Sequence, residues 1–342
     1  MSVITRPEHI ANKVVFVDGL PGCGKTLFSS LISSMDRVEL LSYSYEVEHI
    51  SALFYLNKIP IDAASTLINL QMDLKIYNTM MGRDTNFRAE DLSSVFNNHN
   101  PIRYLKRILE PGDEVILDII SRESPILNLS VHNLLSYSEP IWEALGGRCV
   151  FIEVVRHPLY MMRQQVLNMK NLLGNKRHFT IYFKYKNQVL PYYVNEWKDS
   201  YLKCNPVERV INFIDKLTNR TCTIREELKS KYNAKIITIP FEPFVKSPDN
   251  WIKKIEDVLE TKSTDATAIV MKEQKVPRSV VAQGIDLDIY KRCGWRPPVD
   301  GLTERDELNI RRQEFLKDSS QEAIIVLDKL CANYEKEYWS PD

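Results

Sequence analysis

Short apolar runs alternate with longer amphipathic stretches along most of the chain. Residues 13–18 read Lys-Val-Val-Phe-Val-Asp, a β-branched and aromatic run that is typical of a strand buried in a parallel sheet. Similar runs predict further strands at 38–42, 114–119, 126–131, 148–155 and 234–239. Because amphipathic stretches separate these runs, the pattern predicts an α/β protein with a mostly parallel sheet and helices on both faces.

The amphipathic stretches predict the helices, and one alternating pair predicts a hairpin. Helices are expected at 25–35, 45–98 with breaks near Pro60 and Gly82, 101–109, 158–173, 206–231, 251–260 and 303–338. Apolar and polar residues alternate at 179–185 and again at 189–194, on either side of a short turn. This arrangement is typical of a β-hairpin inserted into the α/β pattern.

Composition narrows the class of protein. The 342 residues include 45 basic and 45 acidic side chains, so the excess of basic charge expected of a dedicated nucleic-acid binder is missing. No apolar run approaches the roughly 20 residues of a transmembrane helix, and the N-terminal stretch has no apolar signal core. The six cysteines are scattered without a CxxC pair, and the six histidines form no HxxxH pair. We therefore expect a cytoplasmic protein with reduced thiols and no zinc site.

Residues 19–26 carry the most specific motif. They read Gly-Leu-Pro-Gly-Cys-Gly-Lys-Thr, match GxxxxGK[ST] in full and lie between a predicted strand and a predicted helix. Glycines let backbone N–H groups curl around phosphate oxygens, and the helix N-terminus adds a favourable dipole. Lys25 would reach the terminal phosphates of the ligand. The predicted nucleotide contacts in this loop are Gly19, Pro21, Gly22, Cys23, Gly24, Lys25 and Thr26.

The loop and the alternating pattern together predict a three-layer P-loop fold with a mostly parallel central sheet. We expect residues 1–342 to form a single domain, because no linker or repeat divides the chain. A helical insertion is expected at 45–110, a β-hairpin insertion at 176–195 and a C-terminal helix at 303–338.

Two residues near predicted strand ends are further candidates. Asp118 closes the apolar run that begins at 114, where a nucleotide hydrolase or kinase would need a carboxylate for Mg²⁺; a turn would use the same residue type. Arg156 follows the strand predicted at 148–155, on the ligand-binding edge of such a sheet, and its planar fork suits a phosphate. The alternative is an arginine that closes the strand and pairs with Glu153 or another carboxylate.

This region resembles the sulfotransferases that use the donor 3′-phosphoadenosine 5′-phosphosulfate. In that family an Arg-x-Pro-x-Asp segment after a strand binds the 3′-phosphate of the donor. Arg156 and Pro158 match it, whereas Tyr160 replaces the aspartate and Gln164 replaces a serine that also binds the phosphate. The phosphosulfate loop of the family reads Pro-Lys-Ser-Gly-Thr-Thr, and residues 21–26 keep its proline, its glycine and its last threonine.

Other patches extend the resemblance over scattered parts of residues 14–278. His132 precedes Arg156 at close to the spacing of the catalytic histidine in the family. Residues 239–248 look like the late strand and Phe-Glu segment of bacterial members, and residues 275–278 share this character, which implies that Arg278 contacts the donor. The Arg-Lys-Gly motif of the cytosolic members is missing.

The resemblance implies a catalytic mechanism that needs no metal. A sulfuryl group would move from the donor to a hydroxyl of a glycan or small metabolite, and His132 would take the proton of that hydroxyl. Lys25 and the loop amides would stabilise charge on the leaving phosphate. For His132 the alternative is a strand-end histidine bonded to a backbone carbonyl. The side chains implied to contact the donor beyond the loop are Arg156, Gln164 and Arg278.

Two other functions remain open. The intact Gly-Lys-Thr, which most sulfotransferases lack, favours an ATP-dependent P-loop kinase acting on a small molecule or sugar, with Mg²⁺ held by Thr26 and Asp118. In that case residues 121–124 resemble the Arg/Glu acceptor site of deoxynucleoside kinases. The other function is a nucleotide-binding regulatory module without transfer chemistry.

Two segments also allow two interpretations each. The tyrosines of the hairpin either cover the acceptor or pack on the core. The C-terminal helix, with Arg305, Arg311, Arg312 and Lys317, is either a solvated face or an oligomer contact, so homo-oligomer formation stays open.

Overall fold

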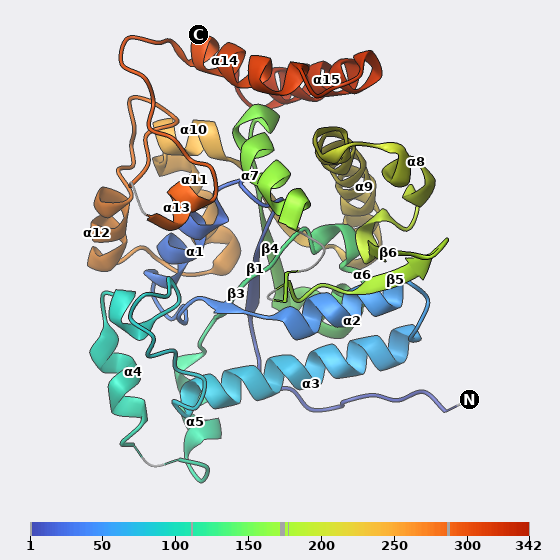
Figure 1. Ribbon diagram of the computed structural model, residues 1–342. Helices are drawn as coiled ribbons and strands as arrows, with labels where there is room; N and C mark the ends of the chain where they lie inside the picture. Colours follow the sequence, from blue (N-terminus) through green and yellow to red (C-terminus); the bar gives the residue numbers. More distant parts are fainter. Residues whose placement is uncertain (1, 111, 172–174, 177, 286–287, 342) are drawn as a thin grey trace.

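A parallel sheet of five strands forms the centre of the molecule (Figure 1), which a computed structural model describes over residues 2–110, 112–171, 175–176, 178–285 and 288–341. The strand order is β2-β3-β1-β4-β7, and every neighbouring pair is parallel. The strands are β1 Val14–Asp18, β2 Ser42–Tyr43, β3 Leu127–Ser130, β4 Cys149–Val155 and β7 Lys235–Pro240. The predicted α/β fold with a parallel central sheet is confirmed.

Helices cover both faces of this sheet (Figure 1). They are α1 Lys25–Ser33, α2 Tyr45–Tyr55, α3 Ile61–Met80, α4 Pro101–Arg107, α5 Ile116–Glu123, α6 Glu139–Leu145, α7 Pro158–Asn171, α8 Lys198–Lys203, α9 Pro206–Tyr232, α10 Phe241–Lys246, α11 Asp249–Leu259, α12 Asp265–Glu273, α13 Asp288–Arg292, α14 Glu304–Leu316 and α15 Gln321–Glu337. None of the described helices is both long and apolar enough to cross a bilayer.

The side chains of β1 alternate between two apolar cores, one on each face of the sheet. Val15 and Val17 join a core that includes residues of α1, α7 and α9, whereas Val14 and Phe16 join a core that includes residues of α3 and α6. All four side chains are fully buried. This alternation follows from the period of two along a strand, and it produces the three predicted layers.

Local sequence explains where several helices begin. At α9, Pro206 occupies the first turn, and the side chain of Asn205 accepts hydrogen bonds from the backbone N–H groups of Val207 and Glu208. Glu208 accepts in return from the N–H of Asn205, which completes a capping box. The helix ends at Tyr232, and the next residue, Asn233, adopts a left-handed conformation that asparagine tolerates.

The prediction of a strand at 114–119 was wrong. This segment contains the start of helix α5, in which Ile116 and Ile120 are buried and Leu117 is exposed. Buried residues four positions apart are typical of a helix, so the short apolar run was ambiguous between the two periods. Of the strand predicted at 38–42, only Ser42 belongs to a strand, β2, and Val38 makes an isolated bridge with Ile126.

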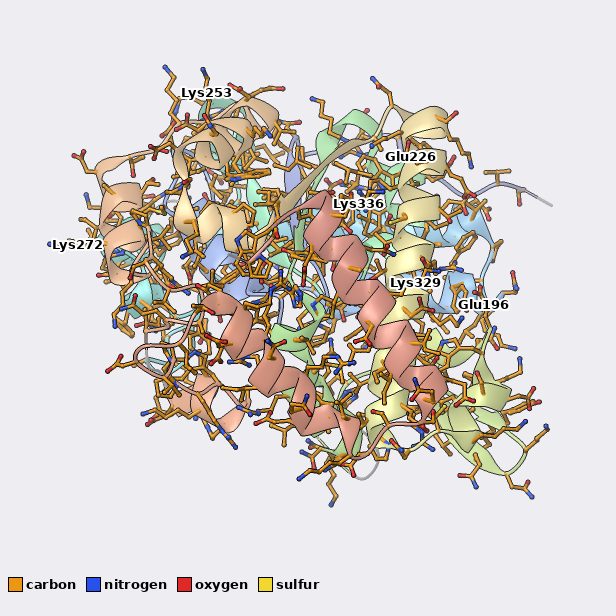
Figure 2. The ribbon with its side chains drawn as sticks, turned by 90° about the horizontal axis from the view of Figure 1, so that it is seen from above. Glu196, Glu226, Lys253, Lys272, Lys329 and Lys336 are labelled. Atoms are coloured by element: carbon orange, nitrogen blue, oxygen red, sulfur yellow. The ribbon has the colours of Figure 1, made fainter. Side chains whose placement is uncertain are left out.

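Two helices, α14 and α15, replace the single C-terminal helix predicted at 303–338. The hydroxyl of Ser320 caps α15 by accepting from the N–H of Ala323, and such a cap starts a new helix. Figure 2 shows α15 beside α9, with Lys329 and Lys336 projecting from it. The other face of α15 packs on the core, where Leu327 is almost fully buried.

The hairpin and the first part of the helical insertion agree with the predictions. The helix expected between Gly82 and residue 98, a stretch that the structure describes in full, is not formed, apart from one 3-10 turn at Val95–Asn97. Strands β5 Tyr182–Tyr185 and β6 Gln188–Pro191 pair antiparallel within the segment predicted at 176–195. Helices α2 and α3 are separated near Pro60, and α3 ends just before Gly82. The end of the helix predicted at 158–173 and position 177 of the hairpin segment lie outside the described residues.

Candidate functional site

The loop between β1 and α1 presents a helix N-terminus that has no side-chain cap. Gly24 precedes α1 with φ of 99°, and no side chain accepts a hydrogen bond from the first turn. A Cβ atom at Gly24 would lie 2.3 Å from the ring of Phe241, so only glycine fits this conformation and this space. The first N–H groups of α1 are therefore suited to bind an anion.

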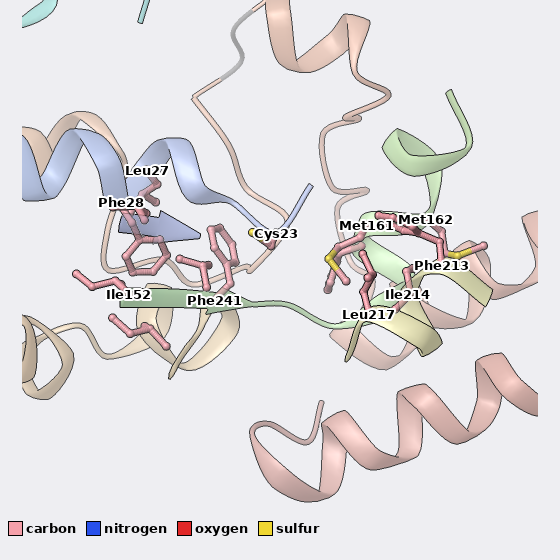
Figure 3. Close-up of a cluster of buried hydrophobic side chains, with 14 of the residues drawn as sticks. Cys23, Leu27, Phe28, Ile152, Met161, Met162, Phe213, Ile214, Leu217 and Phe241 are labelled. Atoms are coloured by element: carbon pink, nitrogen blue, oxygen red, sulfur yellow. The ribbon is translucent and has the colours of Figure 1, made fainter. Parts of the chain in front are cut away.

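Some of the remaining loop residues face the cavity described below, and others face the apolar core. Lys25 is buried, and its ammonium group donates to the carbonyl oxygen of Gly19 at 2.6 Å. Cys23 packs in the apolar core near Phe241 (Figure 3), and burial raises the pKa of its thiol. Gly19 and Cys23 line a small cavity behind the loop and therefore shape it from the side of the core.

One cavity of about 650 Å³ brings together most of the predicted site residues. Its volume is within the range of small-molecule and cofactor sites. Of the residues predicted from the sequence to bind or react, it is lined by Pro21, Gly22, Gly24, Lys25, Thr26, His132, Arg156, Gln164 and Arg278. Gln164 lies against the loop, because its Oε1 would be 3.2 Å from a Cβ atom built at Gly22.

Arg156 follows β4 and contacts the loop directly. Its Nη1 donates to the carbonyl oxygen of Gly22 at 3.0 Å, and its guanidinium lies 4.2 Å from the ring centroid of Phe241. Its Nε is buried without a hydrogen-bond partner in the described parts of the chain, 3.8 Å from Oε1 of Glu242. Burial lowers the pKa of this guanidinium, and the charge of Glu242 opposes that shift.

The alternative of a structural ion pair for Arg156 is confirmed with another carboxylate, Glu242, and not with Glu153. Glu153 pairs with Arg225 of α9 at 3.2 Å and accepts a hydrogen bond from the hydroxyl of Thr238 at 2.7 Å. Its neighbours therefore satisfy this carboxylate, and the guanidinium of Arg156 stays at the cavity.

Two more arginines surround the same aromatic rings as Arg156. Arg278 lies 5.6 Å from the ring centroid of Phe241 and donates to backbone carbonyl oxygens. Burial, with the nearby charge of Arg156, lowers the pKa of Arg278 to about 10. Arg311 of α14 lies 4.7 Å from the ring centroid of Tyr160 and pairs with Glu307. The concentrated positive charge at this end of the cavity favours an anionic ligand.

The interpretation of Arg311 as part of a solvated face or an oligomer contact was therefore wrong. This residue is only 7% exposed and lines the cavity. Tyr160, which stands where the sulfotransferase motif has aspartate, is part of the same wall and donates its hydroxyl hydrogen to Glu304 at 2.9 Å. Both contacts depend on the position of α14, which no local pattern in the sequence indicates.

His132 follows β3 and is bonded to a carboxylate, not to a backbone carbonyl as one interpretation of the sequence had it. Oε1 of Glu48 lies 3.1 Å from Nδ1 of His132 and accepts from its backbone N–H at 2.9 Å. The histidine side chain is 39% exposed, and it lines the cavity together with Glu48. Sequence reasoning missed Glu48. The sequence did contain a signal: Glu48 lies three residues after Tyr45 in a predicted helix, so the two side chains share one face of that helix.

The predicted Mg²⁺ ligands are not brought together. Thr26 lines the cavity, but Asp118 is exposed on α5, a helix that contributes no residue to the cavity lining. The segment 121–124, considered as an acceptor site, begins on the same helix and does not line the cavity either. Among the described residues that line the cavity, the only carboxylate is that of Glu48.

Asp18, the carboxylate directly before the loop, is held by the backbone. It accepts hydrogen bonds from the N–H groups of Leu134 at 3.0 Å and Leu135 at 2.6 Å. Burial raises the pKa of this carboxyl group. Within the described ranges, no group of three or more histidine, cysteine, aspartate or glutamate residues is arranged to hold a metal ion.

No protein-family model and no curated protein matches the chain. Several solved structures resemble it, among them three sulfotransferases. The domain from the Synechococcus PCC 7002 olefin synthase is 10% identical over 92% of this chain and 98% of that one, with a TM-score of 0.40. The domain from the curacin biosynthetic pathway is 12% identical over 93% of this chain and 97% of that one, with a TM-score of 0.45.

The third structure is mouse SULT7A1, solved in complex with PAP. It is 10% identical over 93% of this chain and 89% of that one, with a TM-score of 0.35. These proteins carry the name of the family that the sequence resembles. At these identities and TM-scores the likeness adds nothing to the choice of substrate, so the function proposed below rests on contacts within the cavity.

Proposed function

We propose that this chain is a sulfotransferase-like P-loop transferase, which moves a sulfuryl group from 3′-phosphoadenosine 5′-phosphosulfate to a hydroxyl of a glycan or small metabolite. The observation that carries the proposal is the buried Nε of Arg156, which has no hydrogen-bond partner in the described residues and lies beside the P-loop. A buried donor without an acceptor is unfavourable, and an anionic oxygen from a ligand would satisfy it.

The donor needs two separate anion-binding positions, and the cavity offers both. The N–H groups at the start of α1 and the ammonium of Lys25 suit the phosphosulfate. Arg156 and Arg278 suit a phosphate on the ribose, because a planar guanidinium forms two parallel hydrogen bonds with phosphate oxygens. An anion placed between these two arginines would also relieve the repulsion that contributes to the lowered pKa of Arg278.

His132 is proposed as the general base. It would take the proton of the acceptor hydroxyl while that oxygen attacks sulfur and the bond from sulfur to the phosphate oxygen breaks. Lys25 and the loop amides would stabilise the negative charge left on the phosphate. The products are a sulfate ester and adenosine 3′,5′-bisphosphate.

Aromatic side chains give the acceptor a place to bind. Tyr45, Phe179 and Tyr193 line the cavity, as do His132 and Tyr192. Rings of this kind stack on a sugar or on another ring. Tyr192 and Tyr193 follow β6, so the end of the hairpin segment contributes to this part of the wall.

The test compares thermal stabilisation by adenosine 3′,5′-bisphosphate, adenosine 5′-monophosphate and Mg-ATP. We expect the bisphosphate to stabilise most, because its phosphate on the ribose would bind Arg156 and Arg278. A ligand that binds only the folded state and is present at 100 times its Kd adds about 2.7 kcal/mol to the free energy of unfolding. Arg156→Ala should weaken bisphosphate binding by roughly 10- to 100-fold, since hydrogen bonds to charged groups contribute about 1.5–3 kcal/mol each, and should remove the preference over the monophosphate.

Arg122→Ala, on the exposed end of α5, is the matched control and should leave binding unchanged. Stabilisation by Mg-ATP without stabilisation by the bisphosphate would contradict the proposal. Binding of the bisphosphate without turnover of any hydroxyl acceptor would instead favour the regulatory module.

A P-loop kinase is the second candidate, because residues 19–26 keep the complete GxxxxGK[ST] motif of nucleoside-triphosphate-binding proteins. Mg²⁺ prefers carboxylate and phosphate oxygens. The one carboxylate among the described lining residues, Glu48, already accepts hydrogen bonds from His132. The kinase is therefore the less favoured function. A cytoplasmic location is also proposed, since all six cysteines are free thiols.

A further inference from the structure

Helix α2 presents one polar face to the cavity, at the end where His132 lies. Tyr45, Glu48 and His49 all line the cavity, at helical spacings of three and four residues. Val47 and Ile50, on the other side of the helix, are buried in the apolar core and hold α2 against the sheet. The position of the Glu48 carboxylate is therefore determined by a packed helix and not by a loop.

A single oxygen of Glu48 binds His132 twice. Oε1 accepts from the backbone N–H of His132 at 2.9 Å and lies 3.1 Å from its Nδ1. The backbone bond keeps the carboxylate in place whichever way the ring is protonated. Because a carboxylate only accepts, Nδ1 must carry the hydrogen, and in the neutral ring Nε2 is then the unprotonated nitrogen.

The chain around His132 is tied to the P-loop. The N–H of Val131 donates to the carbonyl oxygen of Val17 at 3.1 Å, and the N–H of Asn133 donates to that of Gly19 at 3.3 Å. These two bonds hold the histidine at a constant position relative to the loop that would bind the sulfuryl donor. The backbone does not fix the orientation or the tautomer of the imidazole ring, and the contact with Glu48 determines both.

We propose that Glu48 is a positioning residue, which holds His132 in the tautomer with a free Nε2, an inference that rests on the proposed sulfuryl transfer. The proton of the acceptor hydroxyl moves to Nε2, the acceptor oxygen bonds to sulfur, and the sulfur–oxygen bond to the phosphate breaks. The imidazolium that forms is stabilised by the adjacent carboxylate. The same division of labour between carboxylate and imidazole operates in hydrolases that contain a carboxylate-oriented histidine.

The other two histidines that line the cavity have different partners. Nε2 of His49 lies 2.6 Å from the carbonyl oxygen of Phe179, so in this contact it must carry the hydrogen. Nδ1 of His178 lies 3.2 Å from the hydroxyl of Tyr182, and burial, with a smaller effect of His132, lowers the pKa of His178. Among these three rings, the ion pairs of the described residues join only His132 to a carboxylate.

The first test reads the tautomer without turnover. Nitrogen-15 spectra of histidine-labelled protein, recorded where the rings are neutral, distinguish protonated from unprotonated ring nitrogens, and His132→Gln assigns the signal. We expect the Nδ1–H form of His132 in the wild type, and the Nε2–H form that free imidazole favours in Glu48→Ala. Glu46→Ala, which removes an exposed carboxylate from the same first turn of α2, should change nothing. An unchanged His132 signal in Glu48→Ala would overturn the proposal.

The second test measures transfer from the phosphosulfate donor. Glu48→Ala should lower kcat by about 10²-fold with the donor KM unchanged, since general-base catalysis contributes roughly 10²–10⁴-fold. Glu48→Gln keeps an acceptor oxygen but loses the charge, so it should retain the tautomer and show a smaller loss. Normal kcat in a folded Glu48→Ala protein would refute the role of Glu48 and leave the proposed function standing. A wild type that binds the bisphosphate, has the expected tautomer and transfers nothing would refute the proposed function alone.

Discussion

Replacing Gly24 by alanine should lower the free energy of unfolding by about 2–6 kcal/mol. The φ of 99° at this position costs an alanine roughly 1–3 kcal/mol of backbone strain. The new Cβ would also lie 2.3 Å from the ring of Phe241. That ring cannot move without cost, because the guanidinium of Arg156 lies 4.2 Å from its centroid on the cavity side. Overpacking of this kind typically costs about 1–3 kcal/mol.

The assay is urea unfolding, in which a lower midpoint with an unchanged slope indicates lost stability. Gly147→Ala is the matched control: a Cβ at Gly147 meets no atom within 4 Å, and its φ lies outside the left-handed region, so alanine should be neutral or slightly stabilising there. Adding Phe241→Leu to Gly24→Ala makes room for the methyl group. The double variant should be more stable than the two single losses predict, because the clash is removed while the φ strain remains.

A loss below about 0.5 kcal/mol in Gly24→Ala, the size of an ordinary surface substitution, would refute this reasoning. It would mean that the loop rearranges without resistance, and that neither the left-handed glycine nor the aromatic contact determines its shape. The same variant should bind adenosine 3′,5′-bisphosphate more weakly, because a displaced loop moves the N–H groups at the start of α1.

Two further predictions test a buried histidine and the metal alternative. His157 is fully buried, and burial lowers its pKa to about 4, so between about pH 4 and 6.5 the unfolded chain binds a proton that the folded chain does not. The free energy of unfolding should therefore fall on acidification through this range, by up to about 3 kcal/mol, and His157→Gln should lack this contribution. If urea titrations gave the same dependence of the unfolding free energy on pH for both proteins, the prediction would be wrong. Asp118→Asn should leave nucleotide binding unchanged in thermal-shift titrations, because this side chain is exposed on α5 and outside the cavity; lost stabilisation by Mg-ATP would instead restore Asp118 as a metal ligand.

Most elements of the sheet could be predicted because their signals are local. The strands β1 and β4 are largely apolar runs, and the motif at 19–26 marks the turn from β1 into α1. The run at 114–119 misled because a few apolar residues fit either a strand or a buried helix face. The break between α14 and α15 at Ser320 could have been predicted, since serine is a strong N-cap. It was missed because charged residues on both sides continue the helical pattern.

The candidate site was predictable only in part, for the same physical reason. The sequence alone predicted the P-loop and the arginine after β4, because the carboxyl ends of parallel strands meet at one edge of the sheet. The histidine after β3 was predicted from the resemblance to the sulfotransferases. Only the tertiary structure decided that Glu48 meets His132, that Arg311 faces Tyr160, and that Asp118 lies elsewhere. Such contacts join elements that are distant in sequence, and they depend on how whole helices pack, which no local periodicity encodes.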